Sequence, residues 1–104
     1  MLNSLFKVRL SEEAKQDLKE IVLYLNDFSA LIASKYYKMI KQKLKELREL
    51  PTWYSFARPE RLKEQGVRWT FVRNYIIFFT VDEAKKEVRV RRILYAKRNF
   101  DDLV

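Results

Sequence analysis

The chain has no cysteine and no histidine, and it contains one glycine and two prolines. The lack of cysteine excludes disulfides, zinc–thiolate sites and cysteine nucleophiles, and it leaves the redox compartment undetermined. The lack of histidine excludes Ser–His and Cys–His pairs, and with them most zinc hydrolase sites. No glycine-rich phosphate loop, metal-ligand spacing or paired-carboxylate signature is present, so we expect no cofactor and no metal. Any catalysis would therefore depend on the side chains of Arg, Lys, Tyr, Asp and Glu.

Long hydrophobic runs are also missing. The longest apolar run covers residues 75–79, which is the length of a strand and far below the roughly 18–20 residues that span a bilayer. The first 15 residues carry charges where a signal peptide would be apolar, and no small-residue cleavage site follows. We therefore expect a cytoplasmic protein that does not insert into a membrane.

Positively charged residues outnumber negatively charged ones in this sequence. Among 104 residues, 22 are Lys or Arg and 14 are Asp or Glu, so the net charge is +8, while 48% of residues are apolar and 14% are aromatic. This apolar content excludes intrinsic disorder, and the length predicts one domain over residues 1–104. The excess of positive charge indicates an anionic partner, which could be nucleic acid, an acidic protein or a membrane surface.

The first half of the chain predicts a strand followed by two helices. Residues 4–10 read as a short strand, after which Ser11 is placed to cap a helix that extends to about Asn26. One face of this helix is apolar at steps of three and four, at Ala14, Leu18, Ile21, Val22 and Leu25. Ser29 is placed to cap a second helix, which we expect to end at Pro51 because proline lacks a backbone N–H. A short loop joins the two helices, so they should form an antiparallel hairpin.

The second half predicts a sheet. Residues 67–71 alternate between apolar and polar side chains, and residues 75–81 are apolar on both faces, as in a central strand covered on both sides. Residues 88–95 form a third strand. The expected fold is therefore α+β, with an N-terminal strand and a helix hairpin packed on one face of a small antiparallel sheet.

Basic residues gather near the end of the chain and in the preceding hairpin. The candidates for binding an anion are Arg68, Arg73, Arg89, Arg91, Arg92, Lys97 and Arg98. Guanidinium groups held together against their repulsion would be stabilised by a phosphate or a carboxylate. The alternative is that some of them form structural ion pairs with Glu12, Glu13, Asp17, Glu87 or Asp101.

The period of a strand also predicts how these cations are oriented. Strict alternation over residues 88–95 places Arg89 and Arg91 on one face, and Arg92 on the other face with Val88, Val90 and Leu94. Aromatic residues in the strands are expected to lie in the core, whereas those after Pro51 could contact a partner: Trp53, Tyr54 and Phe56. The lysines of the second helix most simply form a solvated face.

Several strings, in this order, resemble the RelE/ParE family of toxins from bacterial type II toxin–antitoxin systems. They are Ala14-Lys15-Gln16-Asp17-Leu18-Lys19-Glu20-Ile21, Leu47-Arg48-Glu49-Leu50-Pro51, Gly66-Val67-Arg68, the strand from Asn74 to Asp82, and the end from Val90 to Asn99. The RelE-like nucleases of this family carry an arginine directly after the central-strand tyrosine. Here Ile76 takes that position, so the sequence is closer to the ParE-like members.

The resemblance implies a function. We expect a growth-inhibiting toxin that binds DNA gyrase and is neutralised by a cognate antitoxin, with Arg68, Arg73, Arg89, Arg91, Lys97 and Arg98 contacting the target or the antitoxin. One alternative is a metal-independent nuclease that cuts mRNA on the translating ribosome. In that case Arg68, Arg92 and Arg98 would stabilise the phosphorane, and Tyr95 would donate a proton. Another alternative is a non-toxic module that binds nucleic acid.

Overall fold

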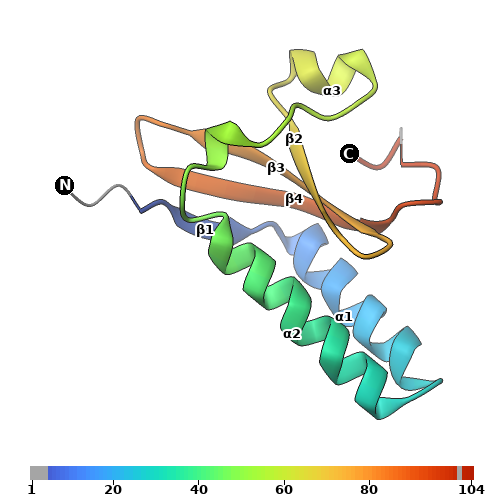
Figure 1. Cartoon of the computed structure of the whole chain (residues 1–104). Coiled ribbons are helices and arrows are strands. Elements are labelled where there is room, and N and C mark those ends of the chain that lie inside the picture. Colours follow the sequence, from blue (N-terminus) through green and yellow to red (C-terminus); the bar gives the residue numbers. More distant parts are fainter. Residues whose placement is uncertain (1–4, 101) are drawn as a thin grey trace.

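The computed structural model describes residues 5–100 and 102–104. Figure 1 shows a twisted sheet with a long helix hairpin against one face and a short helix with the C-terminal segment on the other side. The elements follow in the order β1 (Lys7–Leu10), α1 (Glu12–Asn26), α2 (Ala30–Glu46), the 3-10 turn η1 (Pro51–Trp53), α3 (Glu60–Glu64), β2 (Arg68–Val72), β3 (Tyr75–Asp82) and β4 (Glu87–Tyr95).

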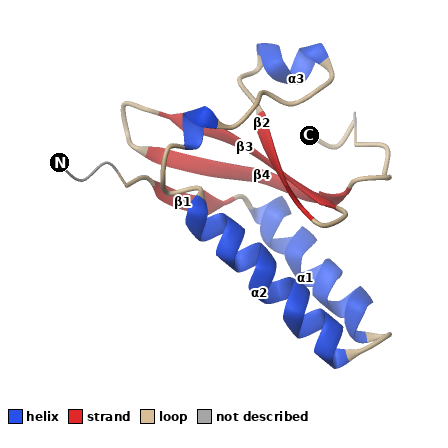
Figure 2. Cartoon of the chain, in the orientation of Figure 1, coloured by secondary structure: helices blue, strands red, loops and turns tan. Residues whose placement is uncertain are grey.

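Both helices of the hairpin begin at the serine that the sequence indicates. The Ser11 hydroxyl accepts a hydrogen bond from the Ala14 N–H at 3.0 Å, and the Ser29 hydroxyl accepts from the Ile32 N–H at 3.2 Å. Each contact satisfies one of the N–H groups that a helix start leaves unpaired. The predicted antiparallel hairpin is confirmed (Figure 2). No helix in the described part of the chain is long and apolar enough to cross a membrane.

The second helix ends earlier than predicted. It stops at Glu46, and Leu47 is its C-cap, so the chain leaves the helix before it reaches Pro51. The reason is tertiary: the Arg48 carbonyl accepts a hydrogen bond from the Phe6 N–H at 2.9 Å, directly ahead of β1. Leu47 itself is fully buried. Contacts that the helical pattern does not encode therefore set this boundary.

The sheet has the strand order β1-β4-β3-β2. Strands β2, β3 and β4 form the predicted antiparallel meander, but β1 pairs in parallel with β4, in the register Val8↔Val88. The expectation of an antiparallel sheet is thus wrong for β1, and the sheet is mixed. Parallel pairing needs a long connection, and the chain between β1 and β4 includes both helices and the other two strands. The predicted strand over 4–10 is shorter, and residue 4 lies outside the described residues.

The helix hairpin buries the first of two apolar clusters. This cluster joins α1 and α2 to the sheet face that carries Tyr75, Ile77 and Phe79. Ile40, Leu47, Ile77 and Phe79 are all fully buried. Burial of each such side chain contributes roughly 1.5–3 kcal/mol, so this face provides much of the stability of the fold.

The opposite face carries a second cluster that the sequence did not predict in detail. Ile76, Phe78 and Leu94 point to this side, and α3 and the C-terminal segment cover them. The rings of Phe78 and Phe100 lie with centroids 5.1 Å apart. The apolar character of β3 on both faces is therefore explained, because each of its faces is covered by a different part of the chain.

Candidate functional site

The predicted basic residues do not form one patch. Arg89 lies 3.7 Å from Glu87, which also pairs with Arg9 at 3.0 Å, and Arg92 pairs with Asp17. Two of the expected structural ion pairs are thus confirmed, while Asp101 lies outside the described residues. In the described part of the chain, no carboxylate forms an ion pair with the remaining cations of the set, which are Arg68, Arg73, Arg91, Lys97 and Arg98.

A β-bulge changes the predicted faces of β4. Phe78 pairs with Arg92 but Phe79 pairs with Val90, so Arg91 is the extra residue on its strand. The bulge shifts the alternation by one position. Ile93 therefore joins Val88 and Val90 on the helix side. The prediction that Arg92 shares a face with Val88 and Val90 is wrong, because alternation assumes a regular ladder.

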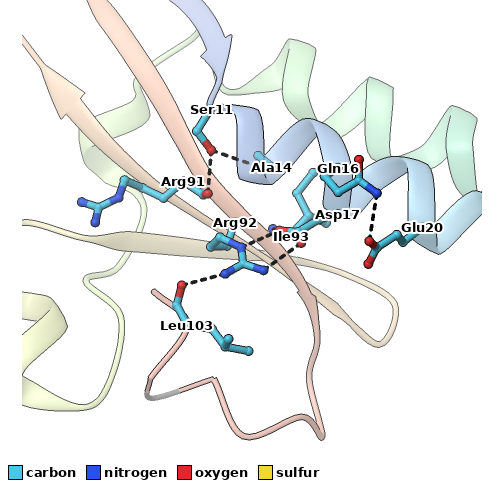
Figure 3. Close-up of polar contacts among 9 residues, drawn as sticks. All are labelled: Ser11, Ala14, Gln16, Asp17, Glu20, Arg91, Arg92, Ile93 and Leu103. Carbon is cyan, nitrogen blue, oxygen red and sulfur yellow. Dashed lines mark hydrogen bonds and ion pairs between the residues drawn. The ribbon is translucent and has the colours of Figure 1, made fainter.

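Arg92 is engaged inside the molecule (Figure 3). Its Nε and Nη2 atoms donate to the two oxygens of Asp17 at 2.8 and 2.9 Å, and its Nη1 atom donates to the Leu103 carbonyl at 2.9 Å. The hydrogen bonds to Asp17 are the largest cause of the raised pKa of Arg92. All three guanidinium nitrogens thus contact in-chain oxygens, and this arginine ties α1 and the C-terminal segment to β4.

Arg68 lies on β2, and its side chain is on the opposite face of the sheet from that of Arg92 on β4. It pairs with Phe79 in the β2–β3 ladder, on the helix side of the sheet. Its Nη1 atom donates to the Tyr54 carbonyl at 2.7 Å, and its guanidinium lies 3.9 Å from the centroid of the Phe56 ring. Of the three loop aromatics that we singled out, Tyr54 packs on Phe79, whereas Trp53 is 79% exposed.

Arg73, Lys97 and Arg98 belong to two segments that lie side by side at one end of the sheet. The turn between β2 and β3 holds Arg73, whose φ of 53° is unusual for a residue with a side chain. The Asn74 carbonyl accepts a hydrogen bond from the Ala96 N–H at 2.6 Å, and the Arg98 N–H donates to the Tyr95 carbonyl at 3.0 Å. These bonds hold the segment after β4 beside the turn. All three cations are exposed, so this end of the sheet is basic and accessible.

A tyrosine-lined pocket adjoins this basic end. It has a volume of about 430 Å³ and lies between α1, the start of α2 and the ends of β3 and β4, and Arg98 is one of its lining residues. Its tyrosines are Tyr24, Tyr36, Tyr75 and Tyr95. Burial raises the pKa of Tyr75, and the neighbouring tyrosines raise it further. The phenol therefore stays neutral at physiological pH and keeps its O–H as a donor.

The residues predicted for RNA cleavage are not brought together. Tyr95 pairs with Tyr75, whereas Arg68 pairs with Phe79. Four residues along a strand separate their positions by roughly 13 Å. Only Tyr95 and Arg98 share a site, because both line the pocket. Among the described residues, no group of acidic side chains could hold a metal ion.

Sequence reasoning did not assign Asp17 or Tyr36 to the site. Asp17 is 7% exposed and lies on the apolar face of α1, where a carboxylate within the i, i+3, i+4 pattern signals a buried polar contact. In the second helix Tyr36 faces inward, with its ring centroid 6.0 Å from that of Tyr75, and Tyr37 is exposed.

The sequence over residues 8–100 matches the family described as the ParE toxin of the type II toxin–antitoxin system, parDE. This match covers most of the 104 residues. The chain belongs to the ParE toxin family. The resemblance to ParE-like members is confirmed, and the candidate site described above is therefore that of a ParE-type toxin. A comparison with curated proteins finds no match.

Two solved structures share the fold of this ParE-family chain. One is a chromosomal ParDE toxin–antitoxin system from P. aeruginosa, which is 20% identical, with a TM-score of 0.73 over 91% of this chain and 100% of that chain. The other is the toxin–antitoxin complex RelBE2 from Mycobacterium tuberculosis, which is 15% identical, with a TM-score of 0.63 over 88% of this chain and 98% of that chain. These likenesses confirm the predicted α+β architecture.

Proposed function

We propose that this ParE-type toxin arrests growth by binding and inhibiting DNA gyrase in the cytoplasm, and that a cognate antitoxin neutralises it. Membership of the ParE family supports a role within a toxin–antitoxin system. The choice of gyrase over mRNA cleavage depends on the residues at the candidate site. In this proposal the cations at the basic end of the sheet are contact residues, and no bond is broken.

The main support for this proposal is the residue that directly follows Tyr75, which is a buried isoleucine. The RelE-like nucleases of the wider RelE/ParE family have an arginine there, whereas Ile76 of this chain is 3% exposed and packs in the second cluster with Phe78 and Leu94. A charged side chain could not be buried there unpaired without a large cost. The fold thus uses this position for its core, which favours a toxin that binds rather than cleaves.

The remaining nuclease candidates point in the same direction. All three guanidinium nitrogens of Arg92 already donate within the chain, and Arg68 lies on the opposite sheet face beside Phe56. Stabilising a phosphorane requires several donors that converge within hydrogen-bond distance of one phosphate. Of the four candidates, only Tyr95 and Arg98 line the same pocket, and tyrosine and arginine are the residue types that contribute most to binding a protein partner.

The distribution of charge supports neutralisation by an acidic antitoxin. The exposed face of α2 carries a row of cations, and among the residues that the structure describes only Lys43 of this helix pairs with a carboxylate, that of Glu46 at 3.2 Å. The basic end with Arg73, Lys97 and Arg98 adds to a net charge of +8. Complementary charge raises the rate of association steeply. Rapid capture is what a cell needs in order to restrain a toxic protein.

A supercoiling assay tests the proposal. The purified chain is titrated into gyrase acting on relaxed plasmid DNA, and the supercoiled product is quantified. We expect supercoiling to fall as the chain is added, and to recover when the cognate antitoxin is present. A topoisomerase that relaxes DNA without ATP serves as the control and should keep its activity.

Primer extension on messages during growth arrest tests the alternative. Intact messages together with an induced DNA-damage response support gyrase as the target. Breaks in phase with codons, combined with unimpaired supercoiling, would instead establish the ribosome-dependent nuclease. Normal growth with soluble chain present would exclude both kinds of toxin.

A further inference from the structure

The tyrosine-lined pocket is rich in polar groups that the chain itself does not use. In the described part of the chain, the hydroxyls of the four tyrosines form no hydrogen bond with another residue. The guanidinium of Arg98 likewise has no ion-pair partner there. A pocket of about 430 Å³ with aromatic walls and a few convergent donors has the composition of a binding site.

The charges around the pocket restrict what can bind. Asp17 is engaged by Arg92 and by the Ile93 N–H, and the Glu20 carboxylate accepts a hydrogen bond from Gln16 at 2.9 Å. Both carboxylates still line the wall, and they would repel a phosphate chain that entered the pocket. Arg98 is therefore the one available cation among the lining residues, and its side chain is exposed. This arrangement suits a single carboxylate outside an aromatic chamber.

The aromatic wall continues out of the pocket toward the free end of the hairpin. Tyr24 is 61% exposed and Phe28 is 70% exposed, and their rings meet edge to face with centroids 5.2 Å apart. Figure 1 shows this end of α1 and α2 extending beyond the sheet. Exposed aromatic residues beside an arginine are typical of the residues that dominate protein–protein interfaces. The pocket and the hairpin end thus form one continuous surface.

We propose that this pocket binds a large aromatic side chain of a partner protein, whose neighbouring carboxylate pairs with Arg98. The inference rests on the proposed function, in which the toxin acts through protein partners, and it specifies the chemistry that such a partner presents. The rings of Tyr36, Tyr75 and Tyr95 already meet edge to face at 6.0 and 5.8 Å. An inserted aromatic ring would continue this packing, while the free hydroxyls donate to the backbone carbonyls of the partner.

A titration of the full chain with N-acetyl-tryptophan tests the inference, because this probe combines an aromatic side chain with a carboxylate. Binding is followed by the backbone amide NMR signals of the labelled protein. We expect shifts confined to amides at the pocket, including Asn74, Ile93 and Tyr95. N-acetyl-tryptophanamide, which lacks the carboxylate, should bind about three- to tenfold more weakly, because a charge-assisted hydrogen bond is lost. Shifts elsewhere, no shifts, or equal binding of both probes would overturn the proposal.

Variants of exposed residues connect the probe to the pocket without disturbing the fold. Arg98→Gln should remove the preference for the carboxylate, and Tyr24→Ala should weaken binding of both probes at least threefold. Trp53→Ala is the matched control, since Trp53 is 79% exposed and lies outside the pocket. An equal effect of all three variants would contradict the assignment. Because this readout involves no gyrase and no growth, it can fail or succeed independently of the proposed function.

Discussion

Asp17 in α1 and Arg92 in β4 are joined by two hydrogen bonds across 75 residues of sequence. The same carboxylate also accepts from the Ile93 N–H at 3.0 Å, at a point on the β4 edge that β1 does not reach. Asp17 is therefore surrounded by three donors although it is 7% exposed. This contact joins the helix hairpin to the sheet, and through Leu103 it also secures the C-terminal segment.

We predict that Arg92→Ala lowers the free energy of unfolding by about 3–5 kcal/mol, because it leaves a buried carboxylate without its partner. Urea denaturation measures the change. Arg89→Ala is the matched control on the same strand, since its pair with Glu87 is exposed and contributes about 0–1 kcal/mol. Similar costs for the two variants would show that Asp17 does not depend on Arg92.

The buried phenol of Tyr75 predicts how stability changes in alkali. Burial, and then the nearby tyrosines, raise its pKa in the folded state, whereas the pKa of an unfolded tyrosine is about 10. The unfolded state thus loses this proton first. The contribution of Tyr75 is complete below about pH 10 and is lost as the pH rises from there through the raised folded value.

Ultraviolet difference absorbance should therefore show a late phase, in which the Tyr75 phenol ionises above the ordinary pKa of tyrosine. In Tyr75→Phe this late phase should be missing, and the free energy of unfolding should fall less between neutral pH and alkali. Tyr37→Phe, at an exposed position on α2, is the control and should retain the late phase. A late phase that survives in Tyr75→Phe would assign it to another tyrosine.

Arg98 should matter for toxicity more than for stability. Its side chain is exposed and has no ion pair among the described residues, so Arg98→Ala should change the free energy of unfolding by less than about 0.5 kcal/mol. We expect the same variant to reduce growth arrest at equal expression. Lys85→Ala, in the turn at the far end of the β3–β4 hairpin, is the charge-matched control and should leave arrest unchanged. Full toxicity of Arg98→Ala would remove this residue from the target-binding site.

Local signals explain why most of the elements could be predicted from the sequence. Ser11 and Ser29 cap their helices by short-range hydrogen bonds, and the apolar run over 75–81 reflects the burial of β3 on both faces. The alternation over 67–71 correctly indicates a strand, but it does not give the buried face, because Thr70 is 8% exposed and Phe71 is 48% exposed. Each of these signals is present within one element. The resemblance to the family also depends on the order of these signals along the chain, and the match of the family over residues 8–100 confirms it.

Features that depend on distant parts of the chain could not be predicted in this way. The bulge at Arg91, the parallel pairing of β1 and the early end of α2 each arise from contacts between separate elements. The residues of the candidate site could likewise not be selected from the sequence alone. Composition identifies a surplus of cations, but only the fold separates Arg92, which is engaged by Asp17, from Arg98, which is not. The pocket itself combines two helices with the end of a sheet.

A comparison of the two helix-capping serines measures how much the contact of Ser11 with the edge of β4 contributes to stability. Both hydroxyls accept a hydrogen bond from a backbone N–H at a helix start, but the Ser11 hydroxyl also donates to the carbonyl of Arg91, the bulged residue, at 2.8 Å. Replacing a capping serine by alanine costs about 1 kcal/mol. The additional hydrogen bond contributes about 0.5–1.5 kcal/mol. Ser11→Ala should therefore destabilise the chain more than Ser29→Ala does, by the amount of that second bond.

Denaturant unfolding of both variants gives this difference directly, and amide exchange shows where it acts. In Ser11→Ala we expect faster exchange along β4 near Arg91, whereas in Ser29→Ala the change should stay at the start of α2. Ser11 and Asp17 both bond to the β4 edge beyond the point where β1 ends. If Ser11→Ala leaves exchange along β4 unaltered, the side chains of α1 do not protect this edge, and the pairing of β4 with β3 alone maintains it.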